Sequence, residues 1–255
     1  MITQFIFGYG SLICSHSRAV TSPEHAHKVA TPVMAQGIER VWSKRTNRNM
    51  TAMGISFSEE ASTVGVLLPV SEEEIQKFDI REQGYDRHEL DLSDVNRVPF
   101  LNDEHYKEED HDVFLEAKKA NAAESIKLWV YVQRQDRPPT EEHPIVQSYV
   151  DTILRGCLNV GGEKFARAFI ETTKGWNPNA LSDLDDDKDG SVTSDGSIQE
   201  ESDDDASSVW VDDRHQPVYV RGDPAYMLKH ADKLDKLLRK YRPEDFQHRK
   251  SFDSA

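Results

Sequence analysis

The sequence is poor in cysteine: it has only Cys14 and Cys157, which lack the paired spacing of a zinc site or a disulfide framework. His25 and His27 have no third metal ligand nearby, so we expect them on the surface and expect no bound metal. No apolar run approaches the ~20 residues of a transmembrane helix. No basic segment precedes the short N-terminal apolar run, as one would in a signal peptide. These absences predict reduced thiols in a soluble, cytoplasmic protein with no membrane association.

The chain also lacks an excess of positive charge. Its formal net charge is −15 over 255 residues, which argues against a nucleic-acid partner because such a partner requires a basic face. The negative charge is concentrated in residues 183–205, where eleven acidic residues and one lysine give a net charge of −10. The rest of the chain is long enough to bury a hydrophobic core as one large domain or two small ones.

Residues 179–208 form an acidic insert that is rich in Asp, Ser and Gly and has almost no apolar residues. Burial cannot offset the entropy of ordering such a segment, so we predict that it is disordered. Asp185, Asp187 and Asp189 match the start of a calcium loop, but Gly196 stands where the loop requires a bidentate glutamate. A solvated acidic linker that is open to a protein partner is the better interpretation.

The expected elements indicate an α+β fold, with strands early and helices late around a curved sheet or small barrel. Ser71 followed by Glu74 is a capping box that predicts a helix start. We divide the chain into a main domain (1–178), the acidic insert (179–208), a returning segment with the C-terminal helix of the same domain (209–242) and a flexible tail (243–255). Strands are expected at 2–7, 34–42, 52–57, 63–70, 85–98 and 126–133, helices at 72–78, 145–158, 163–172 and 225–241, and an extended segment at 210–221.

The first candidate motif is FGYGSL, residues 7–12, directly after an apolar strand. Glycines at such a position can turn backbone N–H groups outward to form a nest for an anion such as a carboxylate. The motif is not a dinucleotide fingerprint, which would need a third glycine where Ile13 stands. The alternative is a tight turn that only closes the strand.

The second candidate motif is DIREQGYDRHEL, residues 79–90, where a helix ends and a strand begins. Glu82 stands at this junction with Gly84 and Tyr85. A carboxylate held there at the mouth of a pocket could act as a general base. The alternative is a surface charge within a charged group, paired with Arg87.

Together the two motifs, with RE-x-GY-x-R about seventy residues after FGYGSL, resemble the gamma-glutamylcyclotransferase superfamily, in particular its glutathione-directed branch and its AIG2-like relatives. The resemblance covers residues 2–178 and resumes at 210–221. It implies a small, mixed, barrel-like sheet with surrounding helices, and an enzyme without cofactor or metal that acts on a small gamma-glutamyl substrate. By resemblance, Glu82 is the catalytic acid/base, and the substrate-binding residues are Tyr9, Gly10, Ser11, Leu12, Tyr85 and Tyr131.

The implied reaction is chemically economical. A gamma-glutamyl amide carries its own nucleophile, the α-amino group, which can close onto the γ-carbonyl to give 5-oxoproline and release the amine. Because the attack is intramolecular, the effective concentration of the nucleophile is very high when the chain is held folded. One carboxylate can take the ammonium proton and return it to the leaving nitrogen.

Two alternatives remain open at this point. The chain could be a binding or regulatory protein on the same fold, or a cyclotransferase for another gamma-glutamyl amine such as gamma-glutamyl-lysine. The segment ICSHSRAVTSPEH departs from the glutathione-directed pattern, in which a tryptophan closely follows the glycine-rich loop. We expect Arg40, Arg45 and Arg48 to include the contacts for a carboxylate on the leaving group.

Overall fold

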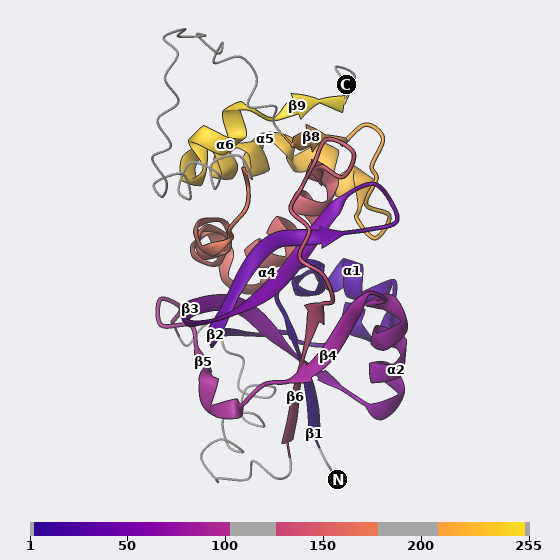
Figure 1. Ribbon diagram of the computed structural model, residues 1–255, viewed down its shortest axis with the longest axis vertical. Helices are drawn as coiled ribbons and strands as arrows, with labels where there is room; N and C mark the ends of the chain where they lie inside the picture. The colour runs from indigo at the N-terminus through magenta and orange to yellow at the C-terminus, as the bar shows by residue number, and fades with distance from the viewer. Residues whose placement is uncertain (1–2, 103–125, 178–208, 253–255) are drawn as a thin grey trace, which may run out of the picture.

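The computed structural model describes residues 3–102, 126–177 and 209–252. Its centre is a six-stranded mixed sheet with the strand order β4-β6-β1-β3-β2-β5 (Figure 1). Only the β1–β6 pair is parallel. The strands are β1 (Thr3–Gly8), β2 (Thr31–Arg45), β3 (Thr51–Val70), β4 (Tyr85–Glu89), β5 (Val95–Arg97) and β6 (Ile126–Gln133).

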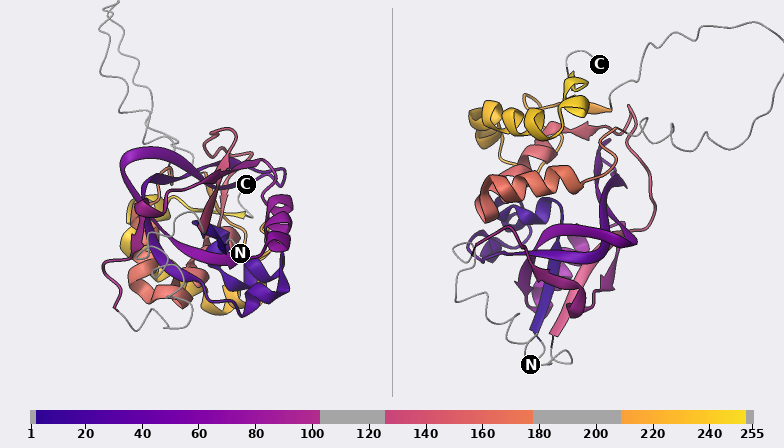
Figure 2. Two further views of the ribbon diagram at one scale, coloured as in Figure 1. Left: turned by 90° about the horizontal axis from the view of Figure 1, so that it is seen from below. Right: turned by 90° about the vertical axis from the view of Figure 1, so that its left-hand side faces the viewer.

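The α+β class is confirmed, but the sheet does not close into a barrel within the described residues. It curves (Figure 2), and its two edges are the short strands β4 and β5, of five and three residues, which pair with β6 and β2 rather than with each other. The predicted strand at 85–98 is therefore split. Its two halves lie at opposite edges, separated by a 3-10 helix at Leu92–Asp94.

The long hairpin of β2 and β3 dominates the sheet. The expected strands at 52–57 and 63–70 are parts of the single 20-residue strand β3. Residues 58–61, three of them polar, separate the two predicted strands. In the structure they form an irregularity in the pairing opposite Gly37, between the pairs Gln36–Ser62 and Ile38–Phe57. Gly37 adopts a φ of +75°, a conformation that favours glycine, and so absorbs the mismatch in register.

Helix α2 (Glu72–Arg81) confirms the predicted capping box. The Ser71 side chain accepts the N–H of Glu74, and the Glu74 carboxylate accepts the N–H of Ser71 at 2.8 Å. The helix ends at Glu82, and Gly84 has a φ of +91°, which allows the chain to turn sharply into β4. Local sequence signals therefore place Glu82 at the helix–strand junction, as expected.

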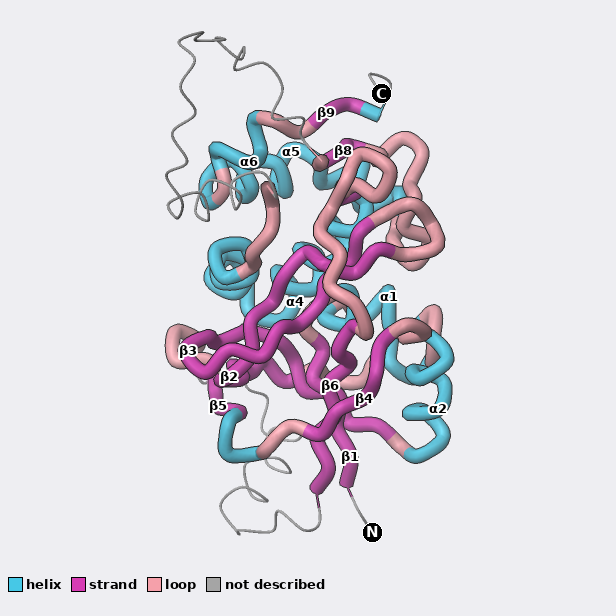
Figure 3. The backbone as a smooth tube through the Cα atoms, viewed as in Figure 1, coloured by secondary structure: helices cyan, strands magenta, loops and turns pink. Residues whose placement is uncertain are grey.

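The later helices extend from the sheet towards the end of the molecule opposite the N-terminus, as the tube in Figure 3 shows. The two predicted helices at 145–158 and 163–172 merge into α4 (Gln147–Thr172), with a kink at Gly161 and Gly162. A Cβ at Gly156 would lie 2.6 Å from the backbone nitrogen of Cys14, so a glycine there lets α4 approach the chain that follows β1. Helix α5 (Pro224–Tyr241) packs on α4.

The predicted flexible tail is wrong for residues 243–252. They form α6 (Pro243–Gln247) and strand β9 (Lys250–Ser251), which joins β7 (Ile145–Val146) and β8 (Trp210–Asp212) in a small parallel sheet. Phe246 packs edge-on against Trp210, with ring centroids 5.7 Å apart. One aromatic residue in a polar stretch gives little sequence signal for such docking. The acidic insert, with its calcium-loop-like start, and residues 253–255 lie outside the described residues.

Three further expectations concern thiols, histidines and membranes. Cys14 and Cys157 are buried free thiols. The surface position predicted for His25 is wrong, because this residue is fully buried in the 3-10 helix Pro23–Ala26, edge-on to Phe78. His27 is exposed. No helix in the described part of the chain is long and apolar enough to cross a membrane.

Candidate active site

The glycine-rich loop leads from β1 into a 3-10 helix at Ser11–Ile13. The first N–H groups of such a helix have no carbonyl partner inside it, so they remain available to a ligand. The buried Arg18 holds the far side of the loop, because its Nη1 donates to the carbonyls of Leu12 and Ile13, each at 2.8 Å. These two hydrogen bonds fix the position of the loop backbone.

Arg40 is a second buried anchor for the loop. It is fully buried and donates to the carbonyls of Tyr9 at 3.4 Å, Val64 at 2.7 Å and Phe169 at 2.9 Å, and to the Thr173 hydroxyl at 2.8 Å. Burial lowers the pKa of its guanidinium to about 9. The expected contact between Arg40 and a substrate carboxylate is therefore wrong, since its donors are engaged within the core.

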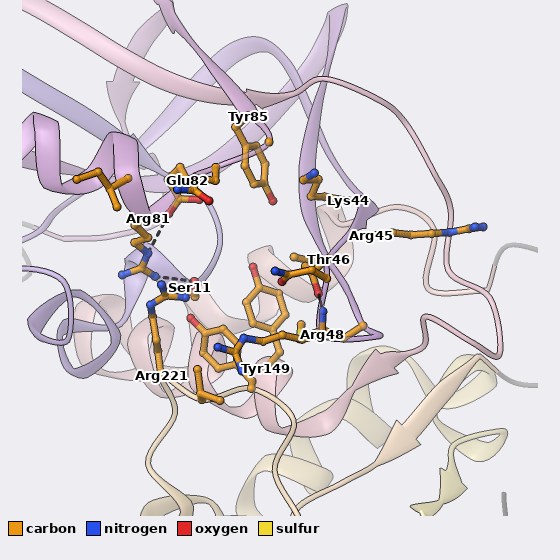
Figure 4. A pocket seen from close by; sticks show the side chains of 18 residues that line it. Ser11, Lys44, Arg45, Thr46, Arg48, Arg81, Glu82, Tyr85, Tyr149 and Arg221 are labelled. Atoms are coloured by element: carbon orange, nitrogen blue, oxygen red, sulfur yellow. Dashed lines mark hydrogen bonds and ion pairs between the residues drawn. The ribbon is translucent and has the colours of Figure 1, made fainter.

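Glu82 lies beside the loop because Arg81 connects the two. Arg81 Nε contacts Glu82 Oε1 at 2.9 Å, while its Nη2 donates to the hydroxyl of Ser11 at 3.0 Å (Figure 4). The Arg81 side chain is only 3% exposed and that of Glu82 17% exposed, so the pair is held at the cavity wall rather than in bulk water. Arg87 instead contacts Asp79, at 3.4 Å. Among the residues that the structure describes, none forms a hydrogen bond or ion pair with the second oxygen of Glu82, which is therefore open to a ligand.

Each of the three predicted tyrosines donates its hydroxyl proton to an acceptor within the protein. The Tyr9 hydroxyl donates to the carbonyl of Tyr131 at 2.5 Å, and the Tyr85 hydroxyl donates to that of Met53 at 2.8 Å. The Tyr131 hydroxyl donates to Asp79 at 2.8 Å. Burial raises the pKa of all three phenols, so they stay neutral at physiological pH. A phenol whose proton is committed can still accept a hydrogen bond.

Two adjoining cavities meet at Ser11, Glu82, Tyr85 and Tyr149. The inner cavity, of about 30 Å³, has room for one small group of a ligand. The outer cavity, of about 500 Å³, has the size of a ligand pocket. All seven predicted site residues line the inner cavity, namely Tyr9, Gly10, Ser11, Leu12, Glu82, Tyr85 and Tyr131.

Several lining residues were not identified from the sequence. Tyr149 comes from α4, where helical spacing suggests an ordinary core residue, and its pKa is raised mainly by burial. Tyr219, whose hydroxyl lies 2.9 Å from that of Ser17, was visible only as part of the resemblance at 210–221. Arg81 looked like one member of a charged group. Only the folded chain shows that these side chains surround Glu82.

No family model matches the sequence, and no curated protein matches it. Similar solved structures include an uncharacterized protein from Homo sapiens, with a TM-score of 0.47 and 13% identity over 76% of this chain and 95% of that one. A gamma-glutamyl cyclotransferase has a TM-score of 0.43 and 13% identity, over 75% and 94% of the two chains. A yeast gamma-glutamyl cyclotransferase specific to glutathione has a TM-score of 0.35 and 15% identity, over 74% and 90%.

Proposed function

We propose that the protein is an intramolecular cyclotransferase that converts a gamma-glutamyl amide into 5-oxoproline and a free amine. The observation that carries the proposal is the position of the Glu82 carboxylate. It stands beside the glycine-rich loop, where the inner and outer cavities meet, and Arg81 holds one of its oxygens. A single well-placed carboxylate is the group that this reaction needs.

In the proposed reaction, Glu82 accepts a proton from the α-ammonium of the substrate. The freed α-amino nitrogen forms a bond to the γ-carbonyl carbon and closes the five-membered lactam. As the ring closes, its nitrogen loses a second proton, and the bond between the γ-carbon and the leaving nitrogen breaks. The two protons taken from the α-nitrogen pass one at a time through Glu82 to the leaving nitrogen, which departs as an ammonium group. Holding the glutamyl chain folded makes this attack effectively unimolecular, which removes much of the entropic barrier.

The hydroxyl groups have different roles in this proposal. Tyr9 and Tyr85 donate to backbone carbonyls, so their oxygens are suited to accept a hydrogen bond from the substrate ammonium. Tyr149 has no carbonyl acceptor among the described residues, and its neutral hydroxyl can donate to the developing oxyanion. The N–H groups at the start of the 3-10 helix would bind the α-carboxylate of the glutamyl group.

The test is release of 5-oxoproline from glutathione, gamma-glutamyl-alanine and gamma-glutamyl-lysine. Glu82→Gln keeps the shape of the side chain but cannot accept the proton, so we expect kcat to fall by about 10²-fold or more while KM changes less. Glu82→Asp should recover little, because its carboxylate is one methylene short of the proton that it must move.

Asp86→Asn is a matched control, because Asp86 pairs with Arg134 at the surface and its loss should leave kcat unchanged. A folded Glu82→Gln variant that forms 5-oxoproline at the wild-type rate would remove the basis of the proposal. If the wild-type protein turns over none of the three substrates, a binding or regulatory protein on this fold becomes the better explanation.

A further inference from the structure

The outer cavity is strongly basic, although the chain as a whole carries a net charge of −15. Five cationic side chains and a single carboxylate, that of Glu82, line it. A cavity lined by one sign of charge attracts ligands of the opposite sign. The cationic residues are Lys44, Arg45, Arg48, Arg81 and Arg221.

Two of these cations already have partners. Arg81 contacts Glu82 and donates to Ser11, and the Nε of Arg45 donates to the carbonyl of Pro138 at 2.9 Å. Figure 4 shows the Arg45 side chain pointing away from the cavity. The side chains of Lys44, Arg48 and Arg221 form no ion pair or hydrogen bond with any residue that the structure describes, so their charges are available to a ligand.

The three available cations come from separate parts of the chain and lie on two sides of the cavity. Arg48 lies in the turn between β2 and β3, and Arg221 in the segment after β8, both on the side of the cavity where Tyr149 lies (Figure 4). Lys44 lies on the side of Tyr85, with its Nζ 5.5 Å from the centre of that ring. Burial lowers the pKa of Lys44, and the charges of Arg134 and Arg137 lower it further. The fold therefore places a charged lysine at the cavity at the expense of some free energy of folding. The available positive charges thus stand on two sides of the cavity, one at Tyr85 and one at Tyr149.

We propose that the outer cavity selects a leaving amine that carries two negative charges, as an acidic amino acid does. This inference rests on the proposed function, because it takes the gamma-glutamyl group to occupy the Glu82 end. The two arginines would bind the side-chain carboxylate of the leaving amino acid, where their planar guanidinium groups allow paired hydrogen bonds, and Lys44 would bind its α-carboxylate. The same charges disfavour a leaving amine with a cationic side chain, such as lysine.

The experiment compares gamma-glutamyl-glutamate with gamma-glutamyl-glutamine, which have the same shape but differ by one negative charge on the leaving amine. We expect kcat/KM to favour the glutamate substrate by at least about tenfold at low salt, a difference of about 1.4 kcal/mol. The ratio should shrink as salt screens the cations. Arg48→Gln and Arg221→Gln should each bring the ratio towards one.

Arg45→Gln is the matched control, because it makes the same change of charge at a side chain that points away, and it should leave the ratio unchanged. Arg221→Glu should instead raise kcat/KM for gamma-glutamyl-lysine relative to the wild-type protein. Equal turnover of the two isosteric substrates, or a ratio that both arginine variants leave intact, would refute the selective cavity alone. If neither of these two substrates nor any of glutathione, gamma-glutamyl-alanine and gamma-glutamyl-lysine yields 5-oxoproline, the proposed function fails and this inference fails with it.

Discussion

Gly10 shows, at the scale of a single residue, why the loop needs a glycine. Its φ is −129°, a value that other residues also adopt, so the glycine is not there to supply a positive φ. A Cβ at this position would instead lie 3.0 Å from the Tyr149 hydroxyl oxygen and 3.3 Å from the Met53 Cβ. The hydrogen of Gly10 therefore leaves space that the inner cavity uses, and a side chain would displace the phenol of Tyr149.

This geometry predicts coupling between positions 10 and 149. Gly10→Ala should lower kcat/KM by about tenfold or more, a loss of about 1.4 kcal/mol, with only a small change in melting temperature. Tyr149→Phe removes the oxygen that the new methyl group would meet, so the double variant should lose less activity than the two single effects combined. Kinetics and thermal melts of all four proteins test this. Strict additivity, or activity that only follows the folded fraction, would contradict it.

At the scale of an element, helix α2 is anchored by charge at its start and presents Glu82 at its end. Burial opposes ionisation of Glu74, yet hydrogen bonds from Lys28 and from the N–H of Ser71 outweigh it and lower the pKa of Glu74 to about 2. The His25 Nε2 lies 3.2 Å from the same carboxylate. Burial, followed by the nearby charge of Lys28, lowers the pKa of His25 to about 4.

The lowered pKa of His25 predicts a loss of stability in mild acid. The folded state resists protonation of this imidazole, so its contribution is complete above the ordinary pKa of 6.5 and is lost as the pH falls towards about 4. The free energy of unfolding, measured by urea titration, should therefore fall less between pH 7 and pH 5 in His25→Gln than in the wild type. His27→Gln, at an exposed neighbour, is the control and should behave like the wild type. Parallel pH profiles for His25→Gln and the wild type would show that His25 does not contribute.

At the scale of the whole molecule, aromatic packing holds together the two segments that flank the acidic insert, which end at residue 177 and begin again at residue 209. Trp176 and Trp210 are both buried, and their ring centroids lie 5.0 Å apart. Trp176 also packs edge-on against Trp42 of β2. These contacts within the folded body bring the two flanking segments together.

Deletion of residues 183–207 should therefore leave melting temperature and turnover nearly unchanged. The retained residues 178–182 and 208 are enough to join ends that already touch, and the deleted segment has almost no apolar side chains to bury. Calorimetry and the 5-oxoproline assay measure both effects. A melting temperature shifted well down, or turnover reduced several-fold, would instead mean that the insert packs on the body.

The sequence by itself determined the features that depend on neighbouring residues. The capping box at Ser71, the position of Glu82 at a helix–strand junction and the turn at Gly84 follow from hydrogen bonds and backbone preferences within a few positions, although α2 runs to Arg81, three residues beyond its predicted end at residue 78. Helix α5 and strand β6 lie within one residue of their predicted bounds for the same reason. The two motifs contain six of the seven predicted site residues and the resemblance adds Tyr131, and all seven are among the residues that line the inner cavity.

Only the tertiary structure decided which side chains face the ligand and which support the loop. Three arginines of one strand and its turn are equivalent in the sequence, yet Arg40 is buried, Arg45 points away and Arg48 lines the cavity. Tyr149 reaches Gly10 from another element, and Arg221 comes from beyond the acidic insert. The partners of these side chains lie far away along the chain, and a one-dimensional pattern carries no information about which of them will meet.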